Sequence, residues 1–375
     1  MNIMVINLNR VIVDVNKIKN NIRTIEKNTK KKIIAVVKSN AYSLNSRYIV
    51  PILKKANVKH FAFNELDEYL AISDLLDDSE CLIMNSSKKV VNKPNIHYTI
   101  NNMDDLRYLL SLNKKVKVQI QIDTGMNRLG IRSMNEFLKI LSIVKNNRNL
   151  IYTGIYTHFS SSKEEIYYYE RQKNKFLDFS NISSPKMIHS AATSSLTKNI
   201  VGNYVRVGMA MYGLTDDTFL ESAVYVKTTI INEFFVKTSD LIGYGQDKIT
   251  KNSHIAIIPL GYYEIADFKQ LYYPIKGKGN ILWQKLKIFG KSCMNHRFII
   301  TNFAVKKFSY LYLFIKNGTI YTDKYRFLVS TANIYKRYIE VKSDLSKVFK
   351  TTNKKGVTLR KRGYSYKIIN FRIIW

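Results

Sequence analysis

The segment Ile33–Tyr42 (IIAVVKSNAY) has the clearest chemical potential in the chain, because an apolar run leads directly into Lys38. A continuous apolar run rich in β-branched residues predicts a strand buried on both faces, as in a parallel sheet. Desolvation at the end of such a strand lowers the pKa of an amine, and a neutral amine can form a Schiff base with an aldehyde such as pyridoxal phosphate. A lone lysine in a basic chain is usually a solvated strand end, so the surrounding elements must decide its role.

The first two-thirds of the chain alternates strand-like apolar runs with amphipathic helical patterns. Repeated βα units predict a parallel sheet, and eight of them would close a TIM-type (β/α)8 barrel with its active site at the carboxyl ends of the strands. We expect strands at residues 33–37, 60–63, 80–84, 97–100, 117–122, 151–157, 186–189 and 204–207. We expect helices near residues 15–28, 65–75, 103–112, 134–144 and 163–179.

After about residue 215 the pattern changes to short strands separated by turns, which predicts an all-β domain. We expect its strands at residues 223–236, 254–259, 280–291, 297–301 and 309–315. Residues 10–15 form a further strand that is expected to pair with this domain. The predicted organisation is therefore a barrel at 10–215, a C-terminal β domain at 216–340 and a basic, weakly patterned tail at 341–375.

The net charge of +32 suggests either a compositional bias or a nucleic-acid partner. The lysines are scattered along the chain and no nucleic-acid-binding motif accompanies them, so we favour compositional bias. The two cysteines, Cys81 and Cys293, predict neither a disulfide framework nor a metal site. We find no apolar stretch long enough to cross a bilayer and no signal-peptide pattern, and we therefore expect a cytoplasmic protein without a membrane partner.

Seven motifs in register resemble the alanine racemase family, whose members are pyridoxal-phosphate (PLP) enzymes with a TIM-type barrel and a C-terminal β domain. Each motif alone is weak, but seven in the family's order are specific. The resemblance runs from about Val11 to Tyr338. The motifs occupy residues 35–42, 122–131, 154–159, 205–213, 243–245, 258–262 and 290–294.

The resemblance implies catalytic roles for four residues. Racemisation removes the α-hydrogen from one face and returns one to the other, so it needs two bases. By resemblance, Lys38 holds the cofactor and serves the face that reacts with the D-enantiomer, and Tyr244 serves the opposite face. A tyrosine with a pKa near ~10 needs cationic neighbours to act as a base, and the resemblance assigns them to His158 and Arg206. Arg206 would also donate to the pyridine nitrogen; because arginine keeps its proton, that nitrogen would stay unprotonated and side reactions such as transamination would be disfavoured.

The resemblance also assigns residues to the cofactor phosphate and the substrate carboxylate. Arg128 resembles an arginine that contacts the cofactor's phenolic oxygen and the carboxylate, a role that suits guanidinium. The backbone N–H of Met294 would meet the same carboxylate. Phosphate donors would be Tyr42, the backbone N–H groups of Gly208 and Met209, Thr193 or its neighbour Ser194, and Tyr325.

Several positions depart from the family pattern. Gln121 stands where many members have a carbamylated lysine, so we expect no carbamate and consider a hydrogen bond to Arg128 instead. Asn295 replaces a usual aspartate, Ala192 a usual asparagine, and Glu264–Ile265 an Asp-Gly pair. These changes leave the substrate preference open, whereas they affect the expected reaction type less.

The leading interpretation is a PLP-dependent alanine racemase that supplies D-alanine for peptidoglycan. It would be a homodimer in which Tyr244 and Met294 complete the partner's active site. A racemase of the same fold acting on serine or another amino acid is the first alternative, and a non-catalytic PLP-binding protein is the second. Single-barrel PLP carriers lack the β domain that supplies Tyr244. A nucleic-acid role would count as a function only if such binding altered racemisation.

Overall fold

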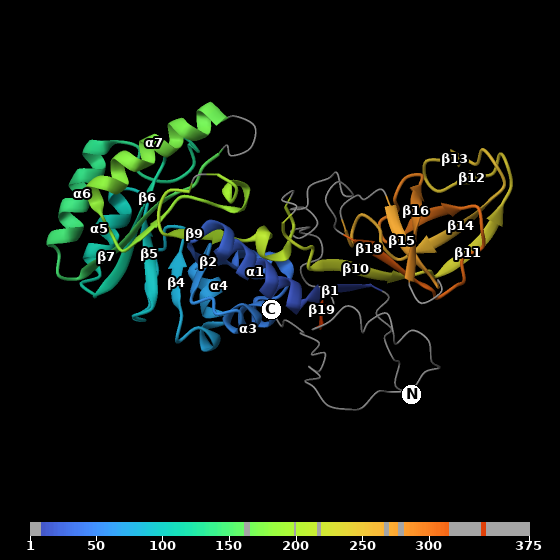
Figure 1. The fold of residues 1–375 in the computed structure, drawn as a ribbon, viewed down its shortest axis with the longest axis horizontal. Coiled ribbons are helices and arrows are strands. Elements are labelled where there is room, and N and C mark those ends of the chain that lie inside the picture. Colours follow the sequence, from blue (N-terminus) through green and yellow to red (C-terminus); the bar gives the residue numbers. More distant parts are fainter. Residues whose placement is uncertain are drawn as a thin grey trace. The chain divides into compact units, whose positions relative to one another are not determined.

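The computed structural model describes residues 9–160, 166–198, 200–215, 219–265, 270–276, 281–314 and 339–342. Eight parallel strands close a barrel in chain order, β2 to β9, which confirms the predicted fold class (Figure 1). Their bounds are β2 Lys32–Val36, β3 His60–Phe63, β4 Glu80–Ile83, β5 Ile96–Ile100, β6 Val116–Ile122, β7 Leu150–Thr157, β8 Met187–His189 and β9 Tyr204–Val207.

Amphipathic helices cover the outside of the barrel strands, as Figure 1 shows for α5, α6 and α7. Helix α1 begins after Asp14, whose carboxylate accepts from the backbone N–H groups of Asn16 and Lys17 at 2.9 and 3.1 Å and so caps the helix. The helices are α1 Val15–Thr29, α2 Lys38–Ser43, α3 Ser46–Lys55, α4 Leu66–Leu70, α5 Met103–Ser111, α6 Met134–Asn146 and α7 Ile166–Ser183. Short 3-10 turns follow at η1 Ser73–Leu75, η2 Thr193–Ser195 and η3 Met209–Tyr212.

The barrel interior is partly polar. Ile34, Leu82, Tyr156, Met187 and Tyr204 form one buried apolar cluster. Buried polar side chains accompany them, namely His97, Gln119 and His189, which are 4%, 0% and 0% exposed. Barrel interiors are usually filled by branched apolar residues, so each of these groups requires a hydrogen-bond partner.

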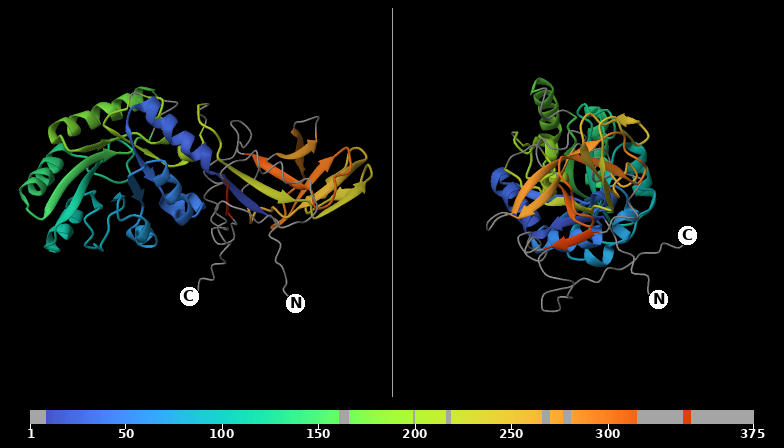
Figure 2. Two further views of the ribbon diagram at one scale, coloured as in Figure 1. Left: turned by 60° about the horizontal axis from the view of Figure 1, so that its bottom comes forward. Right: turned by 90° about the vertical axis from the view of Figure 1, so that its right-hand side faces the viewer.

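The C-terminal strands and β1 form a nine-stranded sheet in the order β11-β14-β17-β16-β15-β18-β10-β1-β19. Figure 2 shows the ribbon from two further directions. Strand β1 (Arg10–Asp14) pairs antiparallel with β10 (Val224–Thr229). The other members are β11 Asn232–Val236, β14 Ser253–Ile258, β15 Gln270–Lys276, β16 Ile281–Phe289, β17 Arg297–Thr301, β18 Tyr310–Phe314 and β19 Ile339–Lys342. A separate hairpin joins β12 (Leu241–Ile242) to β13 (Asp247–Lys248).

Two differences from the predicted elements have local causes. The single strand expected at 223–236 is two strands, β10 and β11, separated at Ile230 and Ile231. Helix α3 and strand β15 were not predicted; each contains a proline, Pro51 and Pro274, a residue that ordinarily argues against both kinds of element. Within the described part of the chain, no helix has the length and apolar character needed to span a membrane.

Candidate active site

Lys38 lies directly beyond the carboxyl end of β2, on a turn with unusual backbone geometry. Residues Ser39–Ser43 have left-handed φ angles between 53° and 63° although none is glycine. The Lys38 side chain is partly buried, and this burial, followed by the positive charge of Arg128, lowers the pKa of its amine, while the charge of Glu68 acts in the opposite direction. A lowered amine pKa raises the neutral, nucleophilic fraction at neutral pH.

Glu68 holds this left-handed turn, and the sequence analysis did not identify it. The backbone N–H of Ser39 donates to Glu68 Oε1 at 2.6 Å, and the N–H of Asn64 donates to Oε2 at 2.8 Å. Asn40 Oδ1 accepts from the backbone N–H of Ser46 at 2.8 Å and from its hydroxyl at 3.0 Å. Such contacts are needed because a left-handed conformation costs a non-glycine residue roughly 1–2 kcal/mol.

Tyr42, at the end of the same turn, forms a cradle with the segment that follows β9. Its side chain is 6% exposed, and its hydroxyl lies so close to Gly208 that a Cβ on Gly208 would stand 1.9 Å from the oxygen. Thr193 Oγ1 accepts from the backbone N–H of Ala210 at 3.3 Å. The segment Gly208–Ala210 thus adjoins both a phenol and a hydroxyl, groups that suit an anion such as phosphate.

The structure describes the other predicted phosphate-binding residues, Met209, Ser194 and Tyr325, to different extents. Met209 begins η3 directly after Gly208, at the cradle. The backbone of Ser194 lies in η2 beside Thr193, but its side chain is outside the described set. Tyr325 lies outside the described residues.

Arg206, on β9, is 4% exposed and held on three sides. Its Nη1 group donates to His189 Nδ1 at 2.6 Å and to the His189 carbonyl at 3.0 Å, and Nη2 donates to the Thr157 carbonyl at 2.5 Å. The guanidinium lies over the Tyr156 ring at 5.1 Å from its centroid. Burial lowers the pKa of Arg206 to about 10, which still leaves the group protonated at neutral pH.

His158 directly follows β7, and nearby cationic residues influence its pKa. Burial, and then the positive charges of Arg206, Arg128 and Lys38, lower its pKa to about 3. These three cations therefore lie near one another at the carboxyl ends of the strands, which is where a barrel of this type places its chemistry. The histidine seen bonded to Arg206 is His189, which sequence reasoning missed; the link between His158 and Arg206 stays a prediction.

Comparison with known proteins identifies the family. The model described as alanine racemase, N-terminal domain, matches residues 13–216. An alanine racemase from Fusobacterium nucleatum subsp. nucleatum is 31% identical over 280 residues, which cover 71% of this chain and 78% of that protein. The chain belongs to the alanine racemase family. The expected enzyme class, an amino-acid racemase, is confirmed at this level.

Solved structures agree with this family fold. A histidine racemase from Leuconostoc mesenteroides subsp. sake has a TM-score of 0.74 at 20% identity, covering 90% of this chain and 98% of that chain. An alanine racemase from Bartonella henselae with covalently bound pyridoxal phosphate has a TM-score of 0.73 at 21% identity, covering 89% of this chain and 99% of that chain. At these identities the likeness concerns the fold.

Gln121 occupies the position at which many alanine racemases have a carbamylated lysine. Its Oε1 accepts from the Tyr156 hydroxyl at 2.8 Å, and its Nε2 donates to the Leu129 carbonyl at 3.1 Å. The hydrogen bond considered between Gln121 and Arg128 is therefore replaced by contacts to Tyr156 and to the backbone next to Arg128. Arg128 itself is exposed, in the loop between β6 and α6.

Tyr244 and Met294 lie in the C-terminal β region and are exposed in the single chain. Tyr244 stands between β12 and β13 and is 83% exposed, and Met294, between β16 and β17, is 55% exposed. The Met294 carbonyl accepts from the backbone N–H of Tyr263 at 2.9 Å. Two residues that depart from the family pattern meet here, because Asn295 Nδ2 donates to Glu264 Oε1 at 2.6 Å.

Proposed function

We propose that this protein is a PLP-dependent alanine racemase that interconverts L- and D-alanine with Lys38 and Tyr244 as bases on opposite faces. The observation that carries the proposal is the gathering of a desolvated lysine, an anion cradle and a buried arginine at the carboxyl ends of the barrel strands. The 31% identity to an alanine racemase over most of the chain supports it.

The residues fit PLP on chemical grounds. A phosphate needs several donors and little bulk, and the absence of a side chain at Gly208 lets the Tyr42 hydroxyl lie directly against its backbone. The backbone N–H groups at Gly208 and Met209 and the Thr193 hydroxyl complete the phosphate donors, with Ser194 and Tyr325 proposed as further members of the set. Lys38 Nζ would hold the cofactor's aldehyde carbon, and Arg206 would face its pyridine nitrogen.

The bound cofactor supplies an electron sink that makes the substrate's α-hydrogen acidic. Lys38 Nζ then takes or returns a proton on one face, for which its lowered pKa is suited. Tyr244 Oη does the same on the other face; of its two proposed neighbours only Arg206 is charged at neutral pH, because the pKa of His158 is lowered to about 3. Arg206 keeps its own proton at neutral pH, so it binds the pyridine nitrogen without protonating it.

Arg128 and the backbone N–H of Met294 are proposed to bind the substrate carboxylate and so orient the α-hydrogen toward the two bases. Since both polar ends of Gln121 are already occupied, by Tyr156 and Leu129, we propose that Arg128 works without a carbamate beside it. A mass increment on Gln121 would contradict this.

The active form is proposed to be a cytoplasmic homodimer with shared active sites. The exposure of Tyr244 and Met294 in the single chain supports this, because a catalytic base 83% open to solvent is not enclosed by its own chain. D-alanine for peptidoglycan is the proposed use of the product.

A second candidate is racemisation of serine or another amino acid by the same residues. The Asn295–Glu264 hydrogen bond at 2.6 Å favours keeping it open, because a carboxylate and an amide adjoin Met294, the proposed carboxylate-binding residue. The likeness in fold to a protein described as a histidine racemase supports keeping this candidate open. A non-catalytic PLP carrier is the remaining alternative.

The test incubates the PLP-loaded protein with single L-amino acids and separates the enantiomers chromatographically. If D-alanine forms fastest, the proposal is supported. If another D-amino acid forms fastest, the mechanism stands but the substrate is a different amino acid. If PLP-loaded protein gives no D-product, the protein is not a racemase.

A complementation experiment tests the shared sites. Lys38→Ala and Tyr244→Phe are each expected to be inactive, while a mixture refolded together should recover activity, because a mixed dimer contains one site with both bases. If Tyr244→Phe alone racemises normally, the two-base mechanism is wrong.

A further inference from the structure

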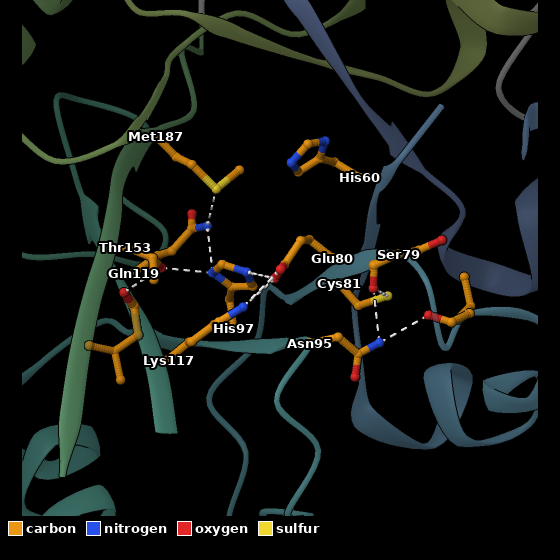
Figure 3. Close-up of polar contacts among 12 residues, drawn as sticks. His60, Ser79, Glu80, Cys81, Asn95, His97, Lys117, Gln119, Thr153 and Met187 are labelled. Atoms are coloured by element: carbon orange, nitrogen blue, oxygen red, sulfur yellow. Dashed lines mark hydrogen bonds and ion pairs between the residues drawn. The ribbon is translucent and has the colours of Figure 1, made fainter. Parts of the chain in front are cut away.

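A row of buried polar side chains crosses the barrel interior and ends at Arg206. At the amino-terminal end of the strands, His97 Nε2 lies 2.5 Å from Glu80 Oε2, and Lys117 Nζ donates to both Glu80 oxygens at 2.7 and 2.8 Å (Figure 3). Gln119 Nε2 lies 3.4 Å from His97 Nδ1, and Gln119 Oε1 lies 2.7 Å from His189 Nε2. His189 Nδ1 in turn lies 2.6 Å from Arg206 Nη1.

The direction of each bond at the Arg206 end follows from which atoms can donate. A guanidinium only donates, so His189 Nδ1 must accept and cannot carry a proton. His189 is fully buried, and its pKa is lowered well below the ordinary value by burial and then by the charge of Arg206, so the ring is neutral. Its one proton is therefore on Nε2, which faces an oxygen of Gln119 rather than its NH2 group.

The other end of the row is polarised by Glu80. Burial alone would raise the pKa of this carboxyl group, but the hydrogen bonds from His97 and Lys117 lower it to about 2. The ionised carboxylate only accepts, so His97 Nε2 carries a proton. The remaining His97 nitrogen, Nδ1, lies 2.7 Å from the Thr153 hydroxyl, which itself donates to the Val118 carbonyl at 2.9 Å, and 3.4 Å from Gln119 Nε2.

The backbone makes room for the Gln119 amide in this row. The pairing of β6 with β7 shifts register between Val118 and Gln119, and Gly154 is the residue opposite Gln119. A Cβ on Gly154 would lie 2.9 Å from Gln119 Cδ and 3.1 Å from Oε1, closer than real Cβ atoms approach their neighbours. The contact confines the amide, and Figure 3 shows it between His97 and Met187, with Nε2 donating to Met187 Sδ at 3.5 Å and Oε1 left to face His189.

We propose that Gln119 is a positioning residue whose side-chain oxygen fixes the tautomer of His189 and thereby the orientation of the Arg206 guanidinium. The inference rests on the proposed function in one respect only, namely that Arg206 faces the pyridine nitrogen of the cofactor. If His189 carried its proton on Nδ1 instead, two donors would oppose each other across 2.6 Å, and the guanidinium would have to turn away.

The direct test measures the tautomer of His189 by 15N NMR in protein labelled at its six histidines, without cofactor or substrate. Protonated and unprotonated imidazole nitrogens give separate 15N signals, and the His189 pair is identified by its loss in a His189→Phe variant. In the unaltered protein the Nε2-protonated form is expected. In Gln119→Met, which keeps the side-chain length but removes the acceptor, the signals should shift toward the other tautomer.

Two further variants separate positioning from packing. Gln119→Glu keeps an oxygen toward His189 and should retain the Nε2-protonated form. Gln172→Met makes the same change at another fully buried glutamine, on α7, and should leave the His189 signals unaltered. If Gln119→Met also leaves them unaltered, or if Gln172→Met shifts them equally, the inference is wrong.

The functional consequence is measured in the PLP-loaded protein. At metal sites, loss of a histidine's orienting partner typically costs roughly 10- to 100-fold in affinity or activity. By analogy we expect a fall of that order in kcat for Gln119→Met, with a smaller change in KM. The kcat of Gln119→Glu should be closer to that of the unaltered enzyme. If the tautomer shifts while kcat stays unchanged, the coupling to Arg206 is refuted. A wild-type protein that racemises nothing would instead refute the proposed function and leave the NMR result standing.

Discussion

Replacing Glu68 with alanine should loosen the turn that carries Lys38. Glu68 Oε1 accepts from the Ser39 backbone at 2.6 Å, and Oε2 accepts from the Asn64 backbone at 2.8 Å. The same carboxylate therefore ties the left-handed turn to the segment between β3 and α4. Its loss leaves these two backbone donors, and the longer contact from the Glu65 N–H at 3.3 Å, without this partner.

The expected loss follows from the strain in the turn and the bonds that offset it. Five non-glycine residues, Ser39–Ser43, have left-handed φ angles, and at roughly 1–2 kcal/mol each they cost about 5–10 kcal/mol. A hydrogen bond to a charged group contributes about 1.5–3 kcal/mol. Because Ser39, Asn64 and Glu68 are only partly buried, we use the lower value for both bonds and expect Glu68→Ala to reduce the free energy of unfolding by about 3 kcal/mol.

Urea unfolding of the cofactor-free protein measures this loss, at one protein concentration throughout because dimerisation would add to the apparent stability. Asp67→Ala is the matched control, since it removes an exposed carboxylate from the same helix and should change the stability by no more than about 0.5 kcal/mol. A second readout is PLP affinity, which should fall in Glu68→Ala alone. If Glu68→Ala costs no more than the control, Glu68 does not hold the turn and the reasoning fails.

Three further predictions concern the cradle, acid stability and the buried arginine. In Gly208→Ala the new Cβ would stand 1.9 Å from the Tyr42 hydroxyl, so the cradle must open and the Kd for PLP, followed by fluorescence, should rise tenfold or more (about 1.4 kcal/mol); an unchanged Kd would contradict the phosphate assignment. The free energy of unfolding should fall as the pH drops below about 6.5. Burial lowers the pKa of His60 to about 4 and that of His158 to about 3, so in this pH range the unfolded chain binds protons that the folded chain does not. Each histidine adds a slope of about 1.4 kcal/mol per pH unit, and urea titrations of His60→Gln between pH 6 and about 4 should show one such slope removed, whereas an identical slope would refute the assignment. Arg206→Lys cannot reproduce the forked contacts to His189 and Thr157, so we expect kcat for racemisation to fall roughly 100-fold and transamination to rise relative to racemisation; kinetics within twofold of the unaltered enzyme would exclude the proposed role.

The barrel strands were predictable because their signal is local. His60–Phe63 and Tyr204–Val207 have the predicted bounds, and the other barrel strands differ by a residue or so at their ends. Each is a short apolar run bounded by polar turns, and such a run remains recognisable without knowledge of its neighbours. Strand β15 was missed because Pro274 interrupts that local pattern, and pairing with β16 and β18 is what makes it a strand.

The residues that contact the proposed cofactor were accessible from motifs, whereas their supports were not. Lys38, Tyr42 and Arg206 lie in recognisable segments of the chain. Glu68 and Gln119 carry no motif of their own. They matter only because closure of the barrel brings Glu68 to the turn after β2 and brings Gln119 to His189, 70 positions away.

The sequence by itself determined the alternation of strands and helices, the position of the reactive lysine and the family, because these depend on residue type and spacing along the chain. The tertiary structure alone decided which histidine bonds Arg206, how Gln119 is oriented and what stabilises five left-handed residues beside Lys38. These features depend on donors and acceptors from separate strands meeting in a buried space, where each must find a partner. No local pattern records such a meeting, because it exists only once the barrel has closed.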